Sequence, residues 1–156
     1  MANKRALITL TPDEQRSFLV HGKTVYIASN GKDGYPHLIA MWYAVDGDTV
    51  LMTTFRKSQK VKNLERDPRC SLLLQEGATY DKLKGLFLRG VCEIVDDEQT
   101  TLRTLAKVGA RMAGAPEISL DDVPAPMRAQ AKKRVTLRFH AKKVASWDHA
   151  KLAGAY

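Results

Sequence analysis

Runs rich in β-branched and aromatic residues recur along the chain, separated by clusters of glycine, asparagine and aspartate. This pattern is typical of short antiparallel strands joined by tight turns. Such strands, each with one face to bury, favour closure into a barrel, although periodicity alone does not separate a barrel from a sandwich. The sequence therefore predicts a mainly β fold of about six strands, over residues 23–29, 36–45, 49–54, 69–75, 84–95 and 135–147.

Helical signals interrupt this pattern. Thr11, Pro12 and Glu14 form a capping box with proline at the first helical position, which marks the start of the first helix. Ser58 is a suitable N-cap for a second helix, and Pro68 stops it. Peripheral helices are therefore expected from Thr11 onward and over residues 58–67, 97–112 and 125–133.

Composition indicates an ordinary globular protein. The 156 residues, 44% of them apolar, are enough for one domain over 1–156 with a full core. No apolar run reaches the roughly 18 residues that a membrane span needs, and the N-terminus lacks a signal peptide, so we expect a cytoplasmic protein. Cys70 and Cys92 lie in predicted strands without CxxC or metal-ligand spacing, which predicts buried reduced thiols and no metal site.

The formal net charge is +8, and such an excess attracts anionic partners. A nucleic-acid surface would interleave basic residues with stacking aromatics, but aromatics are only 7% of the chain, and the basic cluster at 56–62 has just Phe55 at its edge. A phosphorylated small molecule is therefore a better candidate partner than nucleic acid, although plain solubility also accounts for such an excess. We do not expect a membrane partner.

Residues 53–64 join the end of a strand to the start of a helix through a basic loop. Amides at a helix N-terminus point at an anion, and the helix dipole favours negative charge there. Lys57, Ser58 and Lys60 can add charge-assisted and hydroxyl hydrogen bonds. The same residues also fit an ordinary serine-capped helix with a solvated basic surface, and no P-loop pattern is present.

Several fragments, in this order and spacing, give the chain a family resemblance. They are VYIAS at 25–29, GYPH at 34–37, MWY at 41–43, KSxKxxNLxxDPR at 57–69, SL at 71–72, RG at 89–90 and SWD at 146–148. Together they resemble the pyridoxamine 5′-phosphate oxidase-like superfamily of FMN-binding split β-barrels. The branch that the chain looks most like is that of the flavin/deazaflavin oxidoreductases.

The resemblance implies a split β-barrel homodimer with cofactor sites at the subunit interface. One strand would lie along the cofactor ring, two threonines would contact the ribityl chain or phosphate, and the basic loop would hold the phosphate. Lys84 and Phe87 would approach from the partner subunit, with Trp147 near the interface. Trp42 also fits an inward-facing barrel aromatic. The implied cofactor-binding residues are Leu38, Ile39, Ala40, Met41, Thr53, Thr54, Lys57, Ser58, Lys60, Lys84 and Phe87.

The implied function is hydride transfer to or from a small organic substrate, with F420 favoured over FMN because of the basic path that Arg56, Lys57, Lys60 and Lys62 could begin. No acid–base constellation points to catalytic residues, and residues 114–126 are the expected contributor to a substrate pocket. The arginine-containing signature of the pyridoxine-pathway oxidases is missing, so pyridoxamine phosphate is not the expected substrate. The alternative is a non-catalytic protein that binds or stores a flavin, a deazaflavin or haem.

Overall fold

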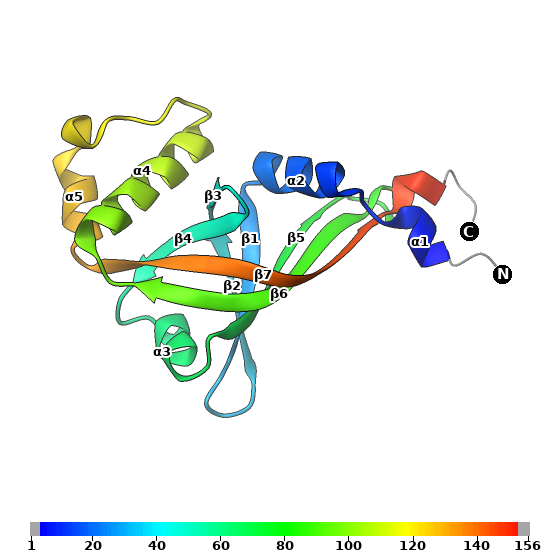
Figure 1. The fold of residues 1–156 in the computed structure, drawn as a ribbon, viewed down its shortest axis with the longest axis horizontal. Helices are drawn as coiled ribbons and strands as arrows, with labels where there is room; N and C mark the ends of the chain where they lie inside the picture. Colours follow the sequence, from blue (N-terminus) through cyan, green and yellow to red (C-terminus); the bar gives the residue numbers. More distant parts are fainter. Residues whose placement is uncertain (1–3, 153–156) are drawn as a thin grey trace.

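A strongly curled antiparallel sheet forms the body of the protein (Figure 1). The computed structural model describes residues 4–152, and within them seven strands pair in the order β2-β1-β5-β6-β7-β4-β3. The predicted split β-barrel architecture is therefore confirmed. The strands are β1 (Thr24–Asn30), β2 (Pro36–Trp42), β3 (Ala44–Asp46), β4 (Thr49–Phe55), β5 (Arg69–Glu76), β6 (Lys84–Val95) and β7 (Arg134–Asp148).

The structure divides the expected strand over 36–45 into β2 and β3. Tyr43 lies between them, fully buried, and donates a hydrogen bond from its hydroxyl to the carbonyl of Leu19 at 2.6 Å. Trp42 is 60% exposed, so its interpretation as an inward-facing barrel aromatic is wrong. The two aromatics are neighbours in sequence, and a strand turns neighbours to opposite faces, so only one of them can enter the core.

The concave side of the sheet holds the main core, because alternate residues of each strand point into it. On β6 the predicted division of faces is confirmed, with Leu86 and Leu88 buried and Arg89 exposed. The β6–β7 register shifts between Arg89 and Gly90, which is the expected β-bulge. Glycine is needed at position 90, because a Cβ there would lie 2.0 Å from the carbonyl oxygen of His140. The core also includes Val25, Ile27, Met52, Val61, Leu72, Leu74, Leu137, Phe139 and both free cysteines.

Helices flank the sheet. The capping box at Thr11 is confirmed, and a short helix that the sequence analysis did not predict precedes it. α4 and α5 pack against each other over a small core of their own, formed by Leu102, Ala106, Val123 and Ala131. No helix in the described part of the chain is long and apolar enough to cross a membrane. The helices are α1 (Lys4–Ile8), α2 (Pro12–His21), α3 (Gln59–Arg66), α4 (Glu98–Ala113) and α5 (Ala125–Ala131), with 3-10 turns η1 (Tyr80–Lys82), η2 (Leu120–Asp122) and η3 (His149–Leu152).

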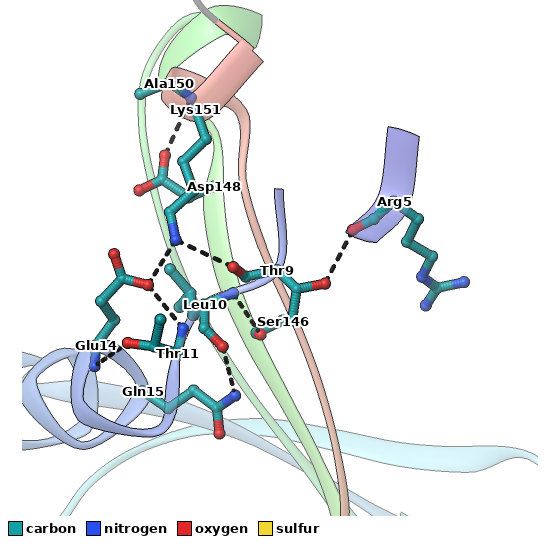
Figure 2. A network of polar contacts seen from close by, with 10 residues as sticks. All are labelled: Arg5, Thr9, Leu10, Thr11, Glu14, Gln15, Ser146, Asp148, Ala150 and Lys151. Carbon is teal, nitrogen blue, oxygen red and sulfur yellow. Dashed lines mark hydrogen bonds and ion pairs between the residues drawn. The ribbon is translucent and has the colours of Figure 1, made fainter. Parts of the chain in front are cut away.

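A polar network, which we call the terminal staple, ties the segment before α2 to the end of β7 and η3 (Figure 2). Lys151 forms an ion pair with Glu14 and donates a hydrogen bond to the carbonyl of Thr9 at 3.0 Å. The amide of Leu10 donates to the hydroxyl of Ser146 at 3.1 Å. Every charged group at the centre of this network therefore has an opposite charge or a hydrogen-bond partner.

Candidate functional site

A cavity of about 390 Å³ lies among β2, β4, α3, α4, α5 and the start of β7. Four consecutive residues of β2, from Ile39 to Trp42, line it. Consecutive strand residues point to opposite faces, so the cavity meets the edge of the strand rather than one face. β2 is an edge strand of the described sheet, and an edge strand has backbone amides and carbonyls free to bind a ligand.

The chain turns sharply at one end of this cavity, from β4 into α3. The amide of Ser58 donates to the carbonyl of Phe55 at 2.9 Å, and α3 begins at the next residue, Gln59. Ser58 holds the N-cap position as predicted, but its side chain does not cap the helix. Its hydroxyl lies 3.3 Å from the Thr54 hydroxyl instead. The amide of Val61 donates to the carbonyl of Ser58 at 3.1 Å, which leaves the amides of Gln59 and Lys60 as the donors at the start of α3 that a ligand could use.

Lys60 lies in the first turn of α3, on the side that faces the cavity. Its ammonium donates a hydrogen bond to the Thr54 hydroxyl at 3.0 Å. Partial burial lowers the pKa of Lys60, and the neighbouring positive charge of Arg134 lowers it further. Both effects disfavour the cationic form of Lys60, the first through loss of solvation and the second through repulsion between like charges.

Arg134 begins β7 beside the same corner. Its guanidinium carbon lies 4.2 Å from the centre of the Phe55 ring, which faces it across the β4–β7 pair. The Nε atom is buried without a hydrogen-bond partner, and Nη1 makes one long contact of 3.5 Å to the carbonyl of Thr53. Burial lowers the pKa of Arg134.

The two cations have no carboxylate partner within ion-pair distance among residues 4–152. A buried charge without a counter-charge is unfavourable unless a ligand supplies one. An oxyanion at this corner would receive charge-assisted hydrogen bonds from Lys60 and Arg134 and a hydroxyl hydrogen bond from Ser58. The backbone amides of Gln59 and Lys60 could donate to it as well. We call this group of residues the anion corner. Its chemistry suits a phosphoryl group.

The sequence model described as "Pyridoxamine 5'-phosphate oxidase" matches residues 11–148. The chain belongs to the pyridoxamine 5′-phosphate oxidase family. No curated protein matches the sequence.

Solved structures of the same fold agree with this assignment. The conserved hypothetical protein Rv2991 from Mycobacterium tuberculosis is similar at 42% identity and a TM-score of 0.86, over 96% of this chain and 91% of that one. A structure described as an F420 reductase is 25% identical, with a TM-score of 0.67, over 86% of this chain and 98% of that one. HutZ, the haem storage protein from Vibrio cholerae, shares the fold at 16% identity and a TM-score of 0.65, over 86% and 95% of the two chains.

Most of the residues predicted from the family resemblance meet at this one cavity. Six of them line it, and Ser58 joins them through its contact with Thr54. Three lie on the edge strand β2, two at the end of β4 and one on α3. The six residues that line the cavity are Ile39, Ala40, Met41, Thr53, Thr54 and Lys60.

The other predicted residues do not line it within the single chain. Leu38 is 62% exposed on the outer face of β2, and Lys57 is exposed beside the anion corner. Lys84 and Phe87 lie on β6, and the Lys84 ammonium sits 5.0 Å from the centre of the Phe18 ring. Arg56 forms an ion pair with Asp96 and donates to the carbonyl of Lys132, so the expected basic path does not start at a free Arg56.

The wall opposite β2 was missed by the sequence analysis. It is built from Leu105, Val108 and Gly109 of α4 and from Met127 and Gln130 of α5. None of residues 114–126, the expected contributor to a substrate pocket, lines this cavity. Three residues of that segment, Glu117, Ile118 and Leu120, border a different cavity between α4 and β3. In the sequence the apolar wall residues look like ordinary core positions of a helix. Their place at the cavity becomes visible only once α4 and α5 are packed together.

Proposed function

We propose that this member of the pyridoxamine 5′-phosphate oxidase family binds a deazaflavin or flavin phosphate in the β2–α4 cavity and uses it for hydride transfer to or from a small organic substrate. The observation that carries the proposal is the anion corner: two poorly solvated cations without a carboxylate partner, at the end of a cavity whose side is an edge strand. F420 is the favoured cofactor and FMN the alternative. The 25% identity to a structure described as an F420 reductase supports that preference.

Each part of the cavity has a task in this proposal. Lys60, Arg134 and Ser58 hold the phosphoryl group, and Thr53 and Thr54 lie where a polyhydroxyl chain would follow it. The exposed backbone edge of β2 can donate and accept hydrogen bonds along the polar rim of a ring. The apolar residues of α4 and α5 keep water away from the opposite side. The bound cofactor supplies the hydride chemistry, and the protein supplies position and electrostatics.

Titration of the apoprotein with F420 and with FMN tests the proposal, followed by quenching of Trp42, which lines the cavity. We expect saturable binding of at least one of the two. Lys60→Ala should weaken that binding about tenfold or more, through loss of a charge-assisted hydrogen bond. Lys4→Ala removes an exposed lysine on α1, outside the cavity, and should leave that binding unchanged. Failure of the wild-type protein to bind either cofactor would reject the proposal.

Turnover separates an enzyme from a storage protein. Anaerobic mixing of the protein, the reduced cofactor and a panel of enones and quinones should give substrate-dependent oxidation of the cofactor. Saturable cofactor binding with no turnover across the panel would instead support the storage alternative.

We also propose that the chain works as a homodimer. The outer face of β1 and β2 carries exposed apolar side chains, including Leu38 at 62%, Trp42 at 60% and Tyr26 at 38%. Register pairing extends this face in a row from Ala40 through Tyr26 and Leu73 to Phe87. Exposed apolar patches of this kind are typical of interaction surfaces.

A two-fold dimer joined through this face would bring the partner's β6 near β2, where the family resemblance places Lys84 and Phe87. Light scattering coupled to gel filtration should give twice the chain mass of 17.4 kDa. Leu38→Glu together with Trp42→Glu should shift the protein to a monomer, whereas Lys32→Glu at the exposed β1–β2 turn should not. A monomeric wild-type protein would reject the dimer and leave the anion corner in place.

A further inference from the structure

Gly109 lies inside α4, where glycine is an unfavourable residue. Glycine loses more backbone freedom on folding than alanine does, so a helix-interior glycine without a reason weakens the helix. Two reasons are common: a left-handed backbone conformation, or a close approach of another part of the chain.

Neither reason applies at Gly109. It is not among the positive-φ glycines of the described residues, unlike Gly114 at the end of the same helix. A Cβ at Gly109 would meet only the terminal methyl of Met127, at an ordinary contact distance of 3.7 Å. At Gly85, in contrast, a Cβ would lie 2.1 Å from the Trp147 ring. The folded chain therefore has room for a methyl group at position 109, yet the residue there is glycine.

The unused room belongs to the cavity of the anion corner. Gly109 lines it next to Leu105 and Val108, on the wall opposite the edge of β2. We infer that Gly109 holds this space open for the flat ring of the ligand, which lies between β2 and the bare backbone of α4. The inference rests on the proposed function, and it makes position 109 the residue that sets how large a ring system the cavity accepts.

The surrounding side chains define the chemistry that such a ring needs. Leu105, Val108 and Met127 offer apolar contact, and Gln130 is the single uncharged hydrogen-bonding side chain on that wall. The cavity of about 390 Å³ is near the small end of the range for ligand pockets, so it takes one ring system rather than a cofactor and a substrate together. A leucine at position 109 would occupy part of the space the ring requires.

Two variants at position 109 test the inference, with a matched control on the same helix. Gly109→Ala adds one methyl group at a site where alanine favours the helix, and should raise the Tm of the apoprotein by about 2–4 °C. Gly109→Leu should fold with a Tm no lower than that of the wild type and lose more than tenfold in affinity for F420 and FMN, measured by calorimetry. Ala113→Leu adds bulk at an exposed position outside the cavity and should bind as the wild type does.

The outcomes separate this inference from the proposed function. Wild-type protein that binds neither cofactor would reject both. Binding by the wild type together with undiminished binding by Gly109→Leu would overturn the role of Gly109 and leave the cofactor site standing. If Gly109→Leu does not fold, Gly109→Met takes its place, because its flexible side chain can lie along the cavity; undiminished binding by that variant would likewise overturn the inference.

Discussion

Two half-buried lysines of this protein stand in opposite situations. Lys151 in the terminal staple has a carboxylate, that of Glu14, and a backbone carbonyl around its ammonium. Lys60 in the anion corner has one hydroxyl as its hydrogen-bond partner, and the charged neighbour that lowers its pKa is another cation, Arg134. The first arrangement stabilises the folded chain. The second contributes no such stabilisation in the free protein, and a bound anion would supply the missing counter-charge. Local conflict of this second kind, in an otherwise consistent fold, is expected at a functional site.

The largest expected effect comes from removal of both cations of the anion corner. Lys60→Met with Arg134→Met keeps most of the apolar volume and removes two charge-assisted contacts, each worth about 1.5–3 kcal/mol. Affinity for the phosphorylated cofactor should therefore fall on the order of 100-fold or more. The apoprotein should be at least as stable as the wild type, because two poorly solvated charges are gone.

Calorimetric titration and thermal denaturation of the same samples measure both halves of that result. Lys4→Met, at an exposed lysine on α1 outside the cavity, is the control. A marked loss of apoprotein stability in the double variant would show that the two cations stabilise the fold. The anion corner would then not differ from the terminal staple in this respect.

The second effect concerns pH at the same corner. Burial and Arg134 lower the pKa of Lys60, so the free protein loses this charge at a lower pH than an ordinary lysine does. Cofactor affinity should therefore weaken as pH rises from neutrality toward the ordinary lysine pKa of about 10.4. Lys60→Arg should bind with little change over that interval, because arginine stays charged. A wild-type affinity that is flat to pH 10 would contradict the proposed role of Lys60.

Local sequence signals predicted the parts of both regions that lie close together along the chain. The capping box at Thr11 is formed by residues within four consecutive positions, so the sequence alone shows it. The turn from β4 into α3 is likewise encoded by a short local segment. Arg134 could not be found this way, because it reaches the corner only through the pairing of β7 with β4. The Lys151–Glu14 pair likewise joins positions 137 residues apart.

The α4–α5 wall failed to appear in the sequence analysis for a related reason. A leucine or valine that lines a cavity has the same helical periodicity as one in a core, and Leu105 and Val108 carry no mark that separates them from Leu102. Gly109 did carry such a mark, as a glycine inside a helical segment, but its meaning depends on the empty space next to it.

A smaller effect should follow from breaking the staple. Lys151→Met removes the partner of Glu14 and the hydrogen bond to the Thr9 carbonyl. The Tm should fall by about 2–4 °C, as is typical of a small local loss in a chain of this size. Cofactor affinity should not change, since neither residue lines the cavity. An unchanged Tm would show that the staple does not stabilise the fold. A loss of cofactor affinity would show that the staple also affects the cofactor site, and either result would contradict separate roles for the two regions.

The smallest expected effect is the pH dependence of the staple. The hydrogen bond from Lys151 and the amide of Thr11 hold the pKa of Glu14 below its usual range. A carboxyl with a lowered folded-state pKa stabilises the protein above its unfolded pKa of about 4.3, and that contribution disappears as pH falls through the folded-state value. The urea midpoint of the wild type should therefore exceed that of Glu14→Gln at pH 7, and the gap should close toward pH 3. The anion corner changes in the opposite direction, because its lysine loses charge as pH rises. A gap that persists at pH 3 would mean that Glu14 acts through packing rather than charge, and the contrast between a paired and an unpaired lysine would then rest on the anion corner alone.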